Sequence, residues 1–102
     1  MSRKVCVQFA VRNMMIMKNT LNQLGFGFDE VSEDQLEIRR SYNNIIINGE
    51  GISYDSANEN EINGIKQAYT VNFYKDQAVR EGMSLVEEKA SNGEIVLRLR
   101  HG

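Results

Sequence analysis

A segment that occurs twice constrains this chain more than any other feature of its sequence. In the first copy Gly25–Val31 leads, after a short polar break, into Leu36–Arg40; in the second, Gly82–Glu88 leads into Ile95–Arg100. Each copy has the pattern of a helix that ends at glycine and is followed by two strands. The copies begin about half a chain length apart, so the sequence predicts one fold made of two related halves.

Each half is predicted to run strand, helix, strand, strand. The halves cover about residues 3–40 and 45–100, and the absence of proline from the 102 residues indicates one domain over 1–102. A lone hairpin or amphipathic helix cannot bury its apolar side. We therefore predict a pseudo-duplicated α+β fold, in which both helices cover one face of a single antiparallel sheet.

The ends of both helices have sequence signals. Apolar residues recur three and four positions apart between Asn13 and Gly25, which predicts a first helix there. Asn13 is expected to cap the start of this helix, and Gly25 is expected to end it. Asn58 and Glu61 have the spacing of a capping box, and they predict a second helix from about residue 59 to 81 that ends at Gly82.

The glycine-rich segment Asn48–Gly51 lies between two apolar strand patterns at 45–47 and 52–54. Asn-Gly suits a type I′ hairpin turn, but a bulge within one long strand fits the pattern as well. The segment lacks the Lys-Ser/Thr of a P-loop and the third glycine of a dinucleotide fingerprint. A structural role is therefore predicted for it, as either turn or bulge.

Composition argues against most catalytic chemistry. The only histidine, His101, is next to the last residue, and the only cysteine is Cys6, so the usual zinc ligand sets cannot be assembled. We expect no enzyme, no cofactor and no metal. A single cysteine makes no internal disulfide, which favours a cytoplasmic location. The longest strictly apolar run, Met14–Met17, is too short to cross a bilayer.

Three arginines are the candidate binding residues. In the last strand Arg98 and Arg100 alternate with inward-facing apolar residues, and Arg39 follows the same pattern in the first half. If the helices cover one side of the sheet, these arginines project from the other, where guanidinium groups suit carboxylate or phosphate. The competing interpretation is that they keep an exposed face soluble and pair with Glu37, Glu87 or Glu88.

Nucleic acid is not the expected partner. The formal net charge is −2, which argues against a generally basic nucleic-acid binder. Sheets that bind RNA also carry aromatic residues on their open face. Here Phe9, Phe26 and Phe28 are expected to point inward.

The chain resembles a known family in four segments: Tyr54-Asp55, Ile62–Tyr69, Ala78–Glu88 and Gly93–Arg100. They are similar to the small conserved proteins typified by hypothetical chloroplast open reading frame 35, a family of unknown function found in algal plastids, cyanobacteria, other bacteria and some phages. The resemblance implies the same fold and a soluble protein, and it supplies no catalytic residues. The chain is shorter than typical members before Tyr54, and it lacks their terminal tryptophan.

Two functions are expected from these observations. The first is a non-enzymatic binding or adaptor protein, with Arg39, Arg98 and Arg100 as contacts to a protein partner. The alternative is a protein of phage origin that sequesters a small anionic ligand such as a nucleotide signal. Its pocket would lie between halves or protomers and be lined by Tyr54, Arg39 or Arg100. An exposed edge strand or the Met15-Ile16 patch could form a homodimer.

Overall fold

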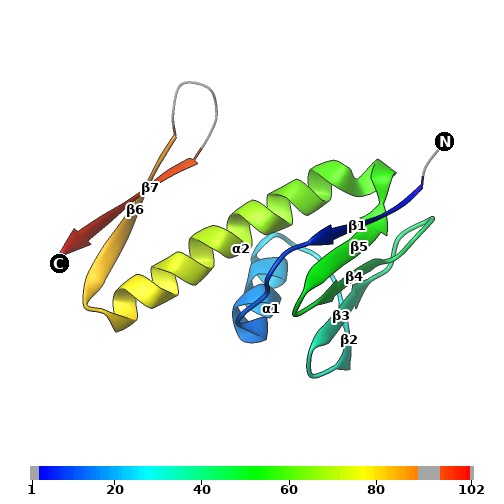
Figure 1. Cartoon of the computed structure of the whole chain (residues 1–102), viewed down its shortest axis with the longest axis horizontal. Helices are drawn as coiled ribbons and strands as arrows, with labels where there is room; N and C mark the ends of the chain where they lie inside the picture. The colour runs from blue at the N-terminus through cyan, green and yellow to red at the C-terminus, as the bar shows by residue number, and fades with distance from the viewer. Residues whose placement is uncertain (1–2, 90–94, 102) are drawn as a thin grey trace. The chain divides into compact units, whose positions relative to one another are not determined.

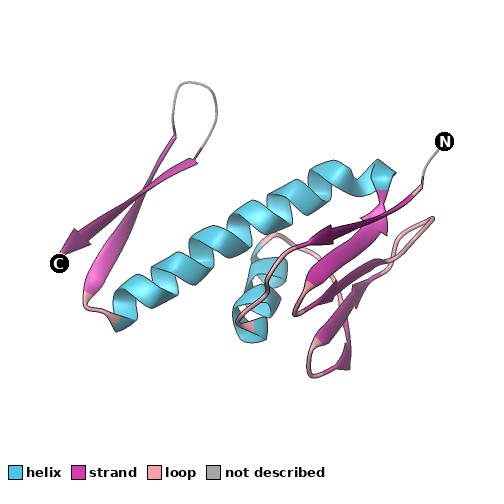
Figure 2. Ribbon diagram, in the orientation of Figure 1, coloured by secondary structure: helices cyan, strands magenta, loops and turns pink. Residues whose placement is uncertain are grey.

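Two helices and seven strands make up the described part of the chain (Figures 1 and 2). The computed structural model describes residues 3–89 and 95–101. In the final hairpin, only the backbone of residues 84–89, 95 and 97–101 is described, whereas the side chain of Val96 is described as well. The elements are β1 Lys4–Gln8, α1 Met14–Gln23, β2 Asp29–Ser32, β3 Gln35–Ile38, β4 Ile45–Asn48, β5 Gly51–Asp55, the 3-10 turn Ser56–Asn58, α2 Glu59–Arg80, β6 Met83–Lys89 and β7 Ile95–His101.

The chain divides into two units, Met1–Tyr69 and Thr70–Gly102. The first unit contains a five-stranded antiparallel sheet in the order β1-β5-β4-β3-β2 (Figure 1). The predicted α+β fold, with helices on one face of an antiparallel sheet, is confirmed. The second unit contains a separate two-stranded sheet of β6 and β7. The expectation that every strand joins one sheet therefore does not hold for the final hairpin among the described residues, and the internal duplication is not confirmed.

Alternation along the strands separates a covered face from an exposed one. Leu36 and Ile38 of β3, Ile45 and Ile47 of β4, and Ile52 of β5 are at most 2% exposed. The residues between them along the strands are only half-buried. The helices contribute Met17 and Leu21 from α1 and Ile62, Ile65 and Tyr69 from α2 to the same core. Burying each of these side chains contributes about 1.5–3 kcal/mol, so this layer is the main source of stability in the first unit.

The ends of α1 are as the sequence predicts. The Asn13 side chain accepts a hydrogen bond from the Ile16 N–H, as an N-cap does. At the other end Gly25 has φ +83°, its N–H donates to the Asn22 carbonyl, and the Phe26 N–H donates to the Leu21 carbonyl. These two bonds make a Schellman motif, which requires the left-handed conformation that glycine adopts at little cost.

The junction between β5 and α2 differs from the predicted capping box. Asp55, not Asn58, receives the first free N–H: its Oδ1 accepts from the Ala57 N–H at 2.9 Å. Its Oδ2 accepts from Asn43 Nδ2 at 3.0 Å, and Asp55 is 1% exposed. Asn58 instead donates to the Glu61 carboxylate at 2.7 Å. A 3-10 turn before the helix therefore moves the cap three residues toward the N-terminus.

We expect Asp55→Ala to lower the free energy of unfolding by about 2–3 kcal/mol, because it removes a cap and a buried charge-assisted hydrogen bond. Asp55→Asn keeps an oxygen for the Ala57 N–H and should cost about half as much. Urea unfolding followed by circular dichroism measures both. Equal losses in the two variants would contradict the assignment of Asp55 as the cap.

The alternatives left open for Asn48–Gly51 are decided in favour of a hairpin turn. β4 and β5 pair antiparallel, with Ile47 opposite Ile52. Asn48 Oδ1 accepts from the Glu50 and Gly51 N–H groups, both at 2.9 Å. The turn is not type I′, because Gly49 and Glu50 lack the positive φ that this type requires. The asparagine side chain therefore closes the turn in place of a left-handed glycine.

Candidate binding surface

The face of the five-stranded sheet opposite the helices is the candidate binding surface, here called the open face. The strand pairing sets Cys6 opposite Ser53, Ser53 opposite Ile46, and Ile46 opposite Glu37. Residues directly opposite each other lie on one face, so these four form a row across β1, β5, β4 and β3. By the same pairing the open face comprises Lys4, Cys6, Gln8, Asp29, Ser32, Gln35, Glu37, Ile46, Asn48, Gly51, Ser53 and Asp55, the last of which is buried.

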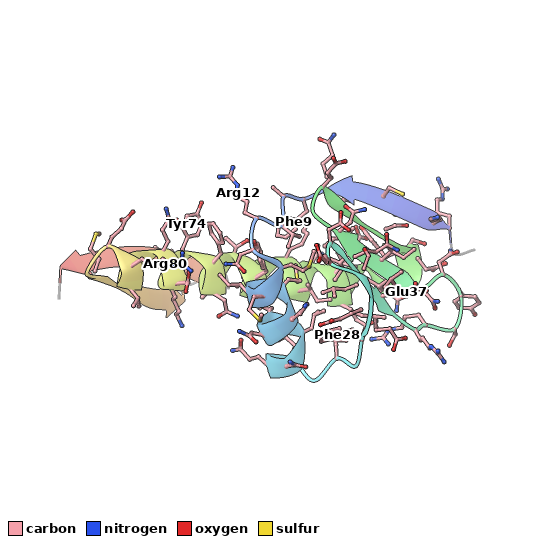
Figure 3. The ribbon with its side chains drawn as sticks, turned by 90° about the horizontal axis from the view of Figure 1, so that it is seen from below. Phe9, Arg12, Phe28, Glu37, Tyr74 and Arg80 are labelled. Atoms are coloured by element: carbon pink, nitrogen blue, oxygen red, sulfur yellow. The ribbon has the colours of Figure 1, made fainter. Side chains whose placement is uncertain are left out.

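The row across the open face is uncharged at Cys6, Ser53 and Ile46, on β1, β5 and β4, and charged at Glu37 on β3. Cys6 is exposed, while Ser53 and Ile46 are half-buried. At the border, Glu37 projects from β3 (Figure 3) and accepts a hydrogen bond from Asn44 Nδ2 at 2.8 Å. Lys4 is at the opposite border, on β1. A weakly polar centre surrounded by charges is the usual composition of a protein–protein contact surface.

A shallow depression of about 200 Å³ opens on this face. It is lined by Cys6, Val7, Asn48, Glu50, Gly51, Ile52 and Ser53. The Ser53 Oγ is buried and has no hydrogen-bond partner among the described residues. A buried hydroxyl without a partner costs roughly 1–3 kcal/mol, so a bound group or water that hydrogen-bonds to it would be stabilising.

Arg39 lies at the acidic border of the open face. It follows β3 directly, its side chain is 87% exposed, and its Nε is 3.6 Å from Asp29 Oδ2. Such an exposed ion pair is weak, so the guanidinium remains able to exchange Asp29 for a partner's carboxylate. The competing interpretation, pairing with a nearby acid, describes Arg39 in this structure, although the acid is Asp29 and not Glu37.

The other predicted site residues do not join Arg39 on this face. Arg98 and Arg100 belong to β7 of the two-stranded sheet, and their side chains lie outside the described part of the structure. Arg39 and these two arginines therefore do not share a sheet. Tyr54 is 3% exposed on the covered face, where burial, and then the nearby Glu59 carboxylate, raise the pKa of its hydroxyl. Neither Tyr54 nor Arg39 lines the depression.

Sequence reasoning overlooked the centre of the open face. Ser53 and Ile46 carry no charge or motif that distinguishes them in the sequence. The signal that could have found them is the alternation in β4 and β5, since each lies between two core residues. Their neighbours in the row depend on the pairing of β1 with β5, which joins distant parts of the chain.

Comparison with known proteins finds no match: no family model, no curated protein and no solved structure is similar to this chain. The resemblance to the family of hypothetical chloroplast open reading frame 35 stays a prediction. Within residues 3–89 and 95–101, no helix is long and apolar enough to span a membrane. The same residues contain no cluster of three or more histidine, cysteine, aspartate or glutamate side chains placed to hold a metal ion.

Proposed function

We propose that this chain is a small non-enzymatic binding or adaptor protein, and that the open face contacts a protein partner. The observation that carries the proposal is the uncharged row of Cys6, Ser53 and Ile46 bordered by Lys4 and Glu37. A sheet face that only meets water usually alternates charged and polar residues, and has no reason to leave its centre uncharged. Arg39, at the border, is the cationic contact we propose on this face.

The exposed part of Ile46 supports the same proposal. A partner that covers the open face would bury Ile46, which is half-buried in the free protein. The neighbouring Cys6 adds a small apolar contact. Arg98 and Arg100 remain proposed contacts on the separate hairpin. A cytoplasmic location also remains a proposal, resting on the single cysteine.

The small-anion alternative has less support from this surface. A nucleotide or other phosphorylated ligand needs cationic or N–H donors around a pocket. Glu50 is the charged residue among those that line the depression. The volume of about 200 Å³ is also below the range typical of drug-sized ligands. Incubation with nucleotides should therefore leave the melting temperature unchanged, whereas a clear rise would favour the alternative.

We expect Ile46→Lys to abolish capture of the partner from native host lysate, because a charge in the centre of a contact would be buried without a counter-ion. The matched control is Met15→Lys, a substitution at an exposed apolar residue of α1. Captured proteins are identified by mass spectrometry, and circular dichroism checks the fold of each variant. A partner retained equally by wild type and a folded Ile46→Lys variant would refute the open face.

A further inference from the structure

The charges of the open face are divided between its two sides. β4 is the middle strand of the sheet, with β5 and β1 on one side and β3 and β2 on the other (Figure 1). The first side carries the exposed Lys4, which makes no ion pair within the described residues. The second side carries Asp29 and Glu37 together with Arg39 at its border, and so has one net negative charge.

Asp55 does not change this division of charge. It lies opposite Lys4 in the pairing of β1 with β5, but it is only 1% exposed. Its carboxylate accepts hydrogen bonds from the Ala57 N–H at 2.9 Å and from Asn43 Nδ2 at 3.0 Å. The carboxylate of Asp55 is therefore engaged inside the copy, and Lys4 is the charge that this side presents to a partner.

The acidic side of the open face is only partly compensated within the chain. Asp29 and Glu37 lie directly opposite each other on β2 and β3, where like charges destabilise a sheet. Arg39 Nε is 3.6 Å from Asp29 Oδ2 in an exposed and therefore weak pair, and Asn44 Nδ2 donates a neutral hydrogen bond to Glu37. A cation supplied from outside the copy would stabilise this side.

The open face is therefore complementary to itself. Ile46 lies on the middle strand, between the cationic side and the acidic side, and is half-buried. An isologous contact brings together the same patch from two copies, so each side of the patch meets the other side of its counterpart. We propose that two copies of this chain form a dimer through their open faces, with Ile46 on the two-fold axis. The dimer rests on the proposed function in taking the open face as the contact surface.

The charges select one of two ways in which such faces stack. With the two-fold axis along the strands, β4 lies over β4 of the second copy, and Lys4 comes to the side that holds Asp29 and Glu37. With the axis across the strands, each of these acids instead faces its own counterpart, and like charges repel. The first arrangement is therefore favoured, and it is compatible with the aligned packing of two sheets found in β-sandwiches.

Charge complementarity favours a second copy as the occupant. A partner for the open face needs a cation on one side, an apolar residue in the middle and an acid on the other side. The chain's own open face has these groups in the matching order, and all of them belong to the first unit. A partner of a single charge sign would be attracted by one side and repelled by the other.

The size of the open face sets the strength of the dimer. Its five strands have four or five residues each, so with strands about 4.8 Å apart and about 3.3 Å per residue the face measures roughly 20 by 15 Å. This area is below the ~800 Å² that each partner buries in a stable interface. We therefore expect a reversible dimer with a dissociation constant between about 10 μM and 1 mM.

Sedimentation equilibrium of the purified chain tests the dimer. The measured mass should rise from 11.7 kDa toward twice that value as the concentration increases. Ile46→Lys should remain monomeric at every concentration, because it sets two positive charges against each other on the two-fold axis. The matched control is Met15→Lys, at an exposed apolar residue of α1, which should dimerise as the unmodified chain does. Circular dichroism checks the fold of each variant.

Charge reversal tests which sides meet. Lys4→Glu and Asp29→Lys should each weaken the dimer about tenfold, because each sets like charges against each other at two symmetric contacts. A mixture of the two variants should restore the dimer, since the introduced glutamate then meets the introduced lysine and Lys4 of one copy still meets Asp29 of the other. Arg12→Glu makes the same change of charge at an exposed residue between β1 and α1, and it should leave the dimer unchanged.

A monomer at every concentration overturns the dimer. A dimer that survives Ile46→Lys, one that is lost in Met15→Lys, and a mixture that stays as weak as its two components each overturn it as well. Capture from lysate separates this failure from failure of the proposed function. A monomeric chain that captures a protein and loses it in Ile46→Lys would use the open face for a different partner, whereas a monomeric chain that captures nothing through this face would overturn both proposals.

Discussion

Gly51→Ala should lower the free energy of unfolding by about 3 kcal/mol or more. A Cβ built on Gly51 collides with the backbone carbonyl oxygen of Val7, and the next nearest atoms also belong to the β1 backbone. Backbone atoms cannot rotate away as a flexible side chain does, so β1 must separate from β5 near the end where Gly51 pairs with Gln8. Urea unfolding followed by circular dichroism measures the loss.

Gly49→Ala is the matched control in the same turn. No atom lies within 4 Å of a Cβ at this position, and its φ is not positive. The substitution should therefore change stability by less than about 0.5 kcal/mol, or increase it slightly by restricting the unfolded chain. If the two substitutions cost the same, close approach of β1 to Gly51 does not determine the stability of this edge.

Local structure was predictable wherever a conformational requirement falls on one residue type. Gly25 and Gly82 end the two helices with φ +83° and +72°, as their positions after amphipathic stretches predict. Asn13 caps α1 for a similar reason. Asn58 shows the limit of this reasoning, because spacing alone does not reveal that the chain makes a 3-10 turn first and that Asp55 is the cap.

The sheet to which a strand belongs was less predictable. Alternation in Ile95–His101 identifies a strand with one apolar side, but it does not specify what pairs with that strand. The similarity between the two halves suggested a common sheet. The structure instead joins the first hairpin to the sheet through β4 and leaves the second as a separate pair. Long-range pairing depends on contacts between distant residues that no local pattern encodes.

In the candidate site too, local features were predictable from the sequence and long-range contacts were not. Alternation correctly predicted that Arg39 is exposed. It did not reveal that the next residue, Arg40, turns back and binds a glutamate 21 positions away on α2. The sequence shows which residues are charged, whereas the tertiary fold determines which acidic side chain each arginine pairs with. The uncharged centre of the open face was missed because absence of charge is visible only after the strands are paired.

Arg40→Ala should lower the free energy of unfolding by about 2–3 kcal/mol. The Arg40 guanidinium donates from Nε to Glu61 Oε1 at 3.1 Å and from Nη2 to Oε2 at 2.7 Å, so the pair is bidentate. Its carbon Cζ lies 5.4 Å from the centre of the Phe26 ring. The pair connects the loop after β3 to the first turn of α2, and both side chains are about one-third exposed or less. A partly buried fork of this kind is worth more than a surface ion pair.

Arg40→Lys separates geometry from charge. Lysine keeps the positive charge but cannot make two parallel hydrogen bonds, so it should recover no more than about half of the loss. Full recovery by lysine would mean that charge alone holds the loop to α2. No loss in Arg40→Ala would mean that the pair contributes nothing to the stability of the first unit.

The same pair predicts how stability depends on pH. The hydrogen bond from Arg40, a second from Asn58 and the Arg40 charge lower the pKa of Glu61, and they outweigh burial, which acts in the opposite direction. A carboxylate whose pKa is lower in the folded state contributes stability above its unfolded pKa, about 4.3, and loses that contribution as pH falls through the folded value. Wild type should therefore exceed Glu61→Gln in stability above about pH 5, and the difference should shrink steadily toward pH 3. Urea unfolding of both proteins across this range measures the difference, and parallel pH profiles would show that Glu61 has the same pKa in the folded and unfolded chains.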